Sequence, residues 1–210
     1  MAATSSTAVV SWEDPPRASK DQGFIPQGRL SKKDSRTCKW TVDGMIKTAQ
    51  VGNFPPSALL FYPEPEARSD WFGPGLIGFH EYPFKIGHVL PFGPLTRSFL
   101  ETFKLAPCQV MPSAWRILLW CETVSAKHEI PFSLADLMFA YEIHQAGSTR
   151  FSLKSQPGME PLILNTPASD RAWPNRFFFA DLDSLGPDCS YLSPGWTRES
   201  KYLFVFLCLL

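Results

Sequence analysis

The chain has 210 residues, of which 44% are hydrophobic and 19% are charged, a composition typical of one globular domain with tails. Its formal net charge is zero, so the chain as a whole has no field that attracts nucleic acid or an anionic membrane. No uncharged stretch approaches the ~20 apolar residues of a membrane span, which argues against a membrane protein. The five cysteines show neither C-x-x-C nor zinc-knuckle spacing, so we expect a reducing, intracellular compartment, either nucleus or cytoplasm.

Residues 1–40 form a basic arm, with seven Lys or Arg against four Asp or Glu, a net charge of +3. The arm is polar and has few periodic apolar positions, which predicts disorder. A cluster of cations within it could contact nucleic acid through phosphates, and a solvated tail is the alternative. The candidate nucleic-acid contacts are Arg29, Lys32, Lys33, Arg36 and Lys39.

Residues 41–75 are rich in proline and are predicted to be a poorly ordered linker. Within them, residues 58–62 (ALLFY) could form a short or edge strand, because prolines stand on both sides. Order is expected to begin near Leu76. Residues 82–89 contain Pro83 and Gly87 and are predicted to be a broken extended piece.

Three helices are expected next. Pro94 opens the first, which carries one apolar face and ends near Lys104. Pro112 opens the second, Pro112–His128, which is apolar nearly all round and is therefore expected to be covered on more than one side. Arg116 is its odd residue, interpreted either as a structural cation, paired with a buried carboxylate or stacked on Trp120, or as a surface site.

The third helix is predicted from Ser133, an N-cap candidate, towards Gly147, a natural helix end. Its apolar positions repeat at helical spacing and include Tyr141. The expected core residues from these helices and from the strand that follows are Trp115, Arg116, Leu118, Leu119, Leu137 and Phe178.

After Gly147 the period changes to that of strands. Residues 149–154 alternate, and with residues 161–164 they suggest a hairpin across a turn. Residues 176–180 (RFFFA) read as a buried strand. Helices followed by strands predict an α+β domain at residues 76–190, of about three helices and a short antiparallel hairpin or sheet, with a tail at 191–210.

Asp181 and Asp183 provide the best enzymatic lead. Two carboxylates at a strand end can hold a divalent metal in a phosphoryl- or glycosyl-transfer enzyme, although such residues more often begin turns. Cys121 and His128 share a helix face but stand about 10.5 Å apart along the axis, too far for one metal. The sequence therefore predicts no metal centre and no cofactor and identifies no small-molecule substrate, and it favours a protein that is not an enzyme.

Several pieces of residues 90–183 together resemble a known family. They are Pro91-Phe92 opening an apolar helix, LAP at 105–107, SAWRIL at 113–118, the alternating FSL at 151–153, and Trp173 followed by RFFF at 176–179. In order and spacing they are similar to the plant gypsy-type transposon domain, often named as a transposase domain.

The resemblance implies a retroelement origin and a non-enzymatic assembly or interaction module, with self-association or nucleic acid as its partner. Relatives usually continue into a long charged region, whereas this sequence stops soon after Trp196. We hypothesise that residues 201–210 (KYLFVFLCLL) are a gene-model artefact. Transcript reads that continue across Arg198 into the stop codon would contradict this.

Overall fold

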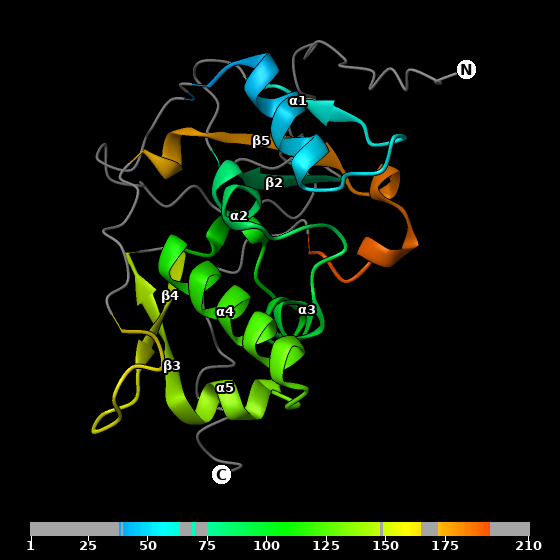
Figure 1. Ribbon diagram of the computed structural model, residues 1–210. Helices are drawn as coiled ribbons and strands as arrows, with labels where there is room; N and C mark the ends of the chain where they lie inside the picture. The colour runs from blue at the N-terminus through cyan, green and yellow to red at the C-terminus, as the bar shows by residue number, and fades with distance from the viewer. Residues whose placement is uncertain are drawn as a thin grey trace, which may run out of the picture.

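The computed structural model describes Cys38, residues 40–63, Ser69 and residues 75–147, 149–164 and 172–193. This part of the chain contains five α-helices and five strands, and all strand pairs are antiparallel (Figure 1). The predicted α+β class is confirmed. The basic arm and the artefact hypothesis for residues 201–210 lie outside the described residues, apart from Cys38 and Trp40 at the end of the arm.

A three-stranded sheet joins the two ends of the described chain. β5 (Phe177–Asp181) lies between β1 (Leu60–Phe61) and β2 (Leu76–His80), and Ala180 is opposite both Leu60 and Ile77. The first four residues of β5 are buried, as the apolar run predicts for a central strand. Because β1 and β2 precede the helices that follow residue 80 and β5 comes after those helices, this sheet closes the fold.

Residues 41–75, expected as a poorly ordered linker, contain both α1 (Val42–Val51) and the short edge strand β1. Thr41 caps α1 by accepting a hydrogen bond from the Gly44 N–H at 3.1 Å, which satisfies one of the free donors of the first turn. Met45 and Ala49, one turn apart, are buried, and the helix packs against α2 (Glu81–Ile86).

Residues 82–89, predicted to be extended, instead include α2 (Glu81–Ile86). Pro83 stands in the first turn, where its missing N–H costs no helical hydrogen bond. Gly87 ends the helix with φ of 114°, a left-handed conformation that a side chain would disfavour.

The central helix α4 has the predicted bounds, Pro112–His128, and packs against α2, against α3 (Pro94–Phe103) and against β4 (Arg150–Ser155). Among the expected core residues, Trp115, Leu118, Leu137 and Phe178 are buried, while Arg116 and Leu119 are half-buried. Between α3 and α4 the chain makes the 3-10 turn η1 (Pro107–Gln109).

The third predicted helix is shorter than expected. Ser133 and Asp136 form the capping box, but α5 (Leu134–Ala140) ends before Tyr141, which begins β3 (Tyr141–Ala146). β3 pairs with β4 (Arg150–Ser155), so the predicted hairpin between residues 149–154 and 161–164 is wrong. The physical reason is that buried and less buried side chains alternate along residues 141–143. Tyr141 and Ile143 are both buried, as one face of a strand requires, so these residues pair with β4.

Beyond β4 the chain runs without helix or strand to residue 164, and η2 (Trp173–Asn175) precedes β5. Two further 3-10 turns, η3 (Asp183–Leu185) and η4 (Pro187–Cys189), follow it. They return the chain to α3, where the Phe92 N–H donates to the Tyr191 hydroxyl and the Arg97 guanidinium lies over the Tyr191 ring.

Glu122 of α4 caps a different helix, α3. Its Oε1 accepts a hydrogen bond of 2.9 Å from the Thr96 N–H in the first turn of α3, where a carboxylate also complements the helix dipole. Gly93, the N-cap residue, has no side chain to supply this bond. A Cβ at position 93 would overlap the Glu122 carboxylate, so only glycine at this position allows Glu122 to reach the Thr96 N–H.

We expect Gly93→Ala and Glu122→Ala each to lower the free energy of unfolding by about 0.5–2 kcal/mol, since both remove the same cap. When Glu122 is already alanine, Gly93→Ala should lower the free energy of unfolding by a smaller amount, because the hydrogen bond from the Thr96 N–H to Glu122 is already absent. Urea denaturation of the two single variants and the double variant measures this coupling. Strictly additive losses would contradict the shared cap.

Candidate functional site

Asp181 and Asp183 lie at the end of β5, and the structure does not bring them together with a third ligand. The Asp181 Oδ1 accepts a hydrogen bond of 2.9 Å from the Ser184 N–H, so this carboxylate caps the turn that leaves the strand. Asp183 is exposed at the start of η3. Within the described ranges, no group of three or more His, Cys, Asp or Glu side chains could hold a metal ion.

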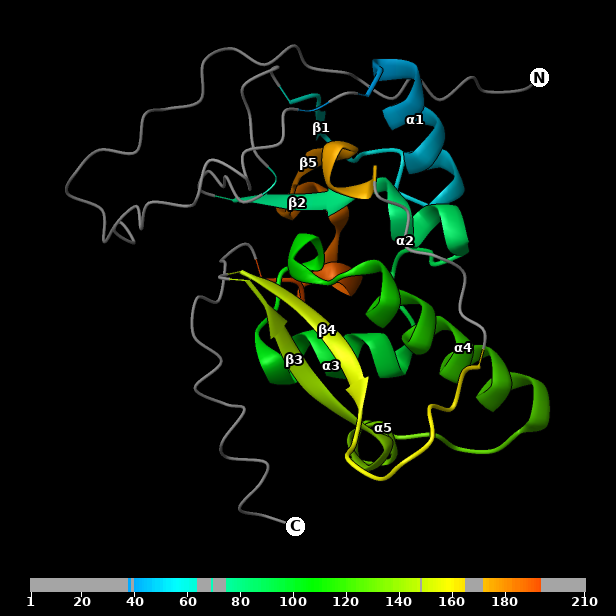
Figure 2. The same ribbon diagram turned by 90° about the vertical axis from the view of Figure 1, so that its left-hand side faces the viewer.

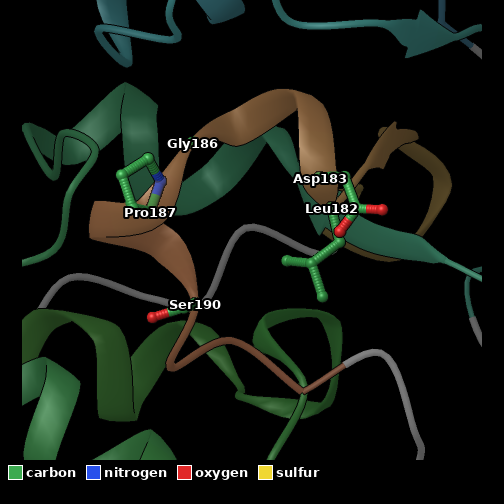
Figure 3. Close-up of a pocket in the computed structure, with 5 residues that line it drawn as sticks. All are labelled: Leu182, Asp183, Gly186, Pro187 and Ser190. Carbon is green, nitrogen blue, oxygen red and sulfur yellow. The ribbon is translucent and has the colours of Figure 1, made fainter.

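A shallow surface pocket of about 370 Å³ adjoins this turn (Figure 3). It is lined by Leu182, Asp183, Gly186, Pro187 and Ser190, and Asp183 is the single carboxylate among these described residues. Asp181 is not part of the lining. The pocket therefore does not gather the paired carboxylates that the enzymatic hypothesis needs.

Two histidines are built into the core. The His88 Nε2 donates to the Trp115 carbonyl at 2.9 Å, and burial lowers the pKa of His88 to about 4. The His80 Nδ1 is 3.3 Å from the Arg176 carbonyl, and burial, with the nearby Arg150 charge, lowers the pKa of His80 to about 3. Both rings are neutral near pH 7, and their burial makes them packing groups rather than exposed acids or bases.

The cysteines that the structure describes are all free thiols, and Cys108, Cys121 and Cys189 are buried. Burial, with a smaller contribution from the Glu122 charge, raises the pKa of Cys121 to about 12. A buried thiol with such a pKa is unreactive in the folded chain, in line with its interpretation as a small core residue.

Arg116, for which a buried carboxylate or Trp120 was considered as partner, contacts Tyr82 of α2. Its Nε donates to the Tyr82 hydroxyl, and its guanidinium lies 5.6 Å from the centre of the Tyr82 ring. This contact joins two helices that pack side by side, which fits the structural interpretation of Arg116.

The cations proposed to contact nucleic acid, from Arg29 to Lys39, lie outside the described residues. The described residues themselves carry nine Lys or Arg and eleven Asp or Glu, a net charge of −2. The described residues therefore supply no net positive charge of their own.

Three large hydrophobic side chains are the most exposed ones among the described residues, and they belong to α5, to the loop before it and to the segment after the β3–β4 hairpin. They are Phe139 at 69% exposure, Leu164 at 66% and Ile130 at 59%. Phe139 belongs to α5, Ile130 to the loop that precedes it, and Leu164 to the end of the segment that follows the β3–β4 hairpin. That segment passes α5 and then runs alongside α4 (Figure 2). We call these three residues the apolar end.

Hydrogen bonds hold the three segments at this end. The Ile130 N–H donates to the Ser125 carbonyl in the last turns of α4. The Gln156 N–H donates to the Ala140 carbonyl at the end of α5, and the Leu162 N–H donates to the Tyr141 hydroxyl at 3.0 Å. The backbones are thus fixed while the three hydrophobic side chains face solvent, a combination typical of surfaces that bind a partner.

Sequence reasoning missed the apolar end. A signal for Phe139 was present: it lies off the face of α5 that Leu137 and Met138 bury, so an amphipathic helix would place it in solvent. Ile130 and Leu164 belong to irregular segments, where no periodicity reports which side chains are covered.

Comparison with known proteins shows no match to a family model, a curated protein or a solved structure. Among the helices within the described ranges, none has the length and apolar character needed to cross a membrane.

Proposed function

We propose that this chain is a non-enzymatic assembly or interaction module, of the retroelement-derived kind that its sequence resembles. The observation that carries the proposal is the apolar end, where Phe139, Leu164 and Ile130 are more than half exposed on hydrogen-bonded segments. The burial of exposed hydrophobic side chains against a partner is favourable and stabilises the complex. Self-association is the simplest form of such an interaction.

The alternative is a metal-dependent phosphoryl- or glycosyl-transfer enzyme that uses Asp181 and Asp183. Such an enzyme needs carboxylates that converge on an open site. The Asp181 carboxylate instead accepts a hydrogen bond from the Ser184 N–H within its own turn, and Asp183 is the one carboxylate among the described residues that line the pocket. These positions favour the module.

Self-association is tested by light scattering after size-exclusion chromatography. We expect wild-type chains to form dimers or larger species as their concentration rises, and Phe139→Asp to raise the dissociation constant at least tenfold, since a charge resists burial in an interface. The melting temperature of Phe139→Asp should hardly change, because the side chain is exposed.

Val51→Asp is the matched control. Val51 is also an exposed hydrophobic residue on a helix, but it belongs to α1, at the opposite end of the molecule from α5 (Figure 1). A monomeric wild type at all concentrations, or equal weakening by Val51→Asp and Phe139→Asp, would reject the apolar end as the interface.

Contact with nucleic acid, as the second part of the proposed role, depends on the arm. Replacing Arg29, Lys32, Lys33, Arg36 and Lys39 by Gln should weaken binding and reduce the slope of log K against log salt by about four, since each phosphate contact contributes ~0.7–0.9. Gel shifts at several salt concentrations measure the slope. Salt-dependent binding that survives deletion of residues 1–40 would exclude the arm as the site.

A further inference from the structure

β3 is a strand that pairs on one side only within the part of the chain that the structure describes. Its neighbour β4 packs against α4, which leaves β3 as the outer strand of the hairpin (Figure 2). The Gln156 N–H donates to the Ala140 carbonyl, so these two residues form a hydrogen-bonded pair that continues the register of the hairpin. Bonded and non-bonded pairs alternate along an antiparallel ladder, so the N–H and C=O of Ile143 point away from β4.

The inner end of this outer edge is already closed. Tyr141 also points away from β4, but its N–H donates to the Leu137 carbonyl of α5 and its carbonyl lies 3.4 Å from the Gln156 Nε2. Among the described residues, none bonds to the N–H or the C=O of Ile143. Such an edge is a template for one more strand, and the free groups centre that strand at Ile143 rather than at Tyr141.

The side chains that flank Ile143 select a second copy of β3 as the added strand. Glu142 is half-buried and His144 is exposed, and within the hairpin they lie opposite Lys154 and Ser152. Two antiparallel copies of β3 with a twofold axis at Ile143 would place Glu142 of each copy opposite His144 of the other. An axis at Glu142 or at His144 would instead place two identical side chains opposite each other. Charge complementarity therefore favours the axis at Ile143.

We propose that β3 is the edge through which this chain self-associates, with a second copy adding its own β3 in antiparallel orientation about a twofold axis at Ile143. The two Ile143 residues exchange two backbone hydrogen bonds, and Glu142 and His144 form two cross-strand pairs. The two hairpins become one four-stranded sheet, and the symmetry closes the assembly as a dimer. This deepens the proposed function and rests on it: α5 leads directly into β3, so the second copy would lie beside Phe139.

An exchange of the two flanking side chains tests this register by light scattering. His144→Glu places carboxylates opposite each other in both pairs, and we expect it to raise the dissociation constant of the dimer about tenfold. Adding Glu142→His restores both pairs, so the double variant should return to within about threefold of the wild type. Lys47→Glu, on an exposed position of α1 far from β3, changes the net charge and should leave the dissociation constant unchanged (Figure 1).

Disulfide formation in the full-length chain tests the same pair without relying on charge. Non-bonded antiparallel pairs bring two Cα atoms to ~4.5 Å, which a disulfide can span. Glu142→Cys chains are mixed with His144→Cys chains and oxidised with diamide, and the joined peptides are identified by mass. We expect the disulfide between the two different variants to form at least about tenfold faster than the disulfide of either variant with itself.

Equal rates of these disulfides, or a double variant that associates no better than His144→Glu, would overturn the pairing of β3. If the wild type still associates in that case, the proposed assembly role stands and only the choice of edge is wrong. A wild type that stays monomeric at all concentrations would reject both the edge and the assembly role.

Discussion

Lowering the pH from 6.5 to 4 is expected to reduce the free energy of unfolding by several kcal/mol, at up to ~1.4 kcal/mol per pH unit for each of two histidines. Burial lowers the pKa of His80 to about 3 and that of His88 to about 4, from an ordinary 6.5. In this window the unfolded chain binds protons that the folded chain does not. The part of the stability that depends on these two neutral histidines is therefore fully present above pH 6.5 and is lost as the pH falls.

Glu122 acts in the opposite sense. Burial raises the pKa of Glu122 above 4.5, so the folded chain binds this proton more tightly than the unfolded chain does. The contribution of Glu122 to the free energy of unfolding therefore falls as the pH rises through its raised pKa. It offsets part of the loss from the histidines on the acid side. Between pH 6.5 and 5 the free energy of unfolding should still fall with falling pH, because the two histidines outweigh the single glutamate.

His88→Gln isolates one of the two protons. A glutamine amide can donate to the Trp115 carbonyl as the His88 Nε2 does, and it does not titrate. Urea denaturation across pH 4–7 should show a dependence of the free energy of unfolding on pH that is reduced by about one proton. A wild-type slope in His88→Gln would contradict the assignment.

Trp115→Ala should cost about 3–5 kcal/mol, the largest loss expected from one core truncation. Trp115 is 1% exposed at the centre of the fold, with the His88 ring 4.9 Å and the Phe92 ring 5.2 Å from its own. Removing the indole leaves a cavity between α4 and the chain that precedes α3. Urea denaturation, or circular dichroism if the variant unfolds, measures the loss.

Trp115→Phe is the matched comparison. The Trp115 Nε1 is buried and has no hydrogen-bond partner among the described residues, so its loss breaks no bond. The phenyl ring fills much of the same space, and the cost should stay below ~1.5 kcal/mol. A similar loss in both variants would mean that the indole N–H, rather than the volume of the ring, matters at this position.

The helices that the sequence predicts well are those whose ends are marked by local chemistry. Pro94 and Pro112 each open a helix, and the Ser133–Asp136 capping box opens α5 where the pattern places it. α1 was missed because Thr41, its cap, follows a basic, polar stretch and because only a few of its residues are buried. α2 was missed because Pro83 and Gly87 suggest a break, whereas they occupy its first turn and its C-cap.

The boundary between α5 and β3 shows where local pattern fails. Tyr141 continues the helical spacing of Leu134, Leu137 and Met138, and it also begins the strand alternation that Ile143 follows. Pairing with Ser155 of β4 decides between the two, and that partner is fourteen residues away. Long-range pairing overrides local preference here, so the hairpin partner could not be read from residues 149–164.

For the candidate site, sequence spacing identified the pair Asp181 and Asp183 but could not show that Ser184 occupies one carboxylate. The apolar end depends on which side chains remain uncovered after folding, a property of the tertiary packing around α5. Phe139 is the exception, because its position off the buried face of a helix follows from the sequence.

Hydrogen exchange at two protein concentrations tests most directly whether the apolar end is a binding surface. At the higher concentration, backbone amides of α5 and of residues 159–164 should gain protection, while those of α1 serve as an internal reference and do not change. Protection confined to α1, or no difference over a hundredfold range of concentration, would contradict the proposed assembly role of this surface.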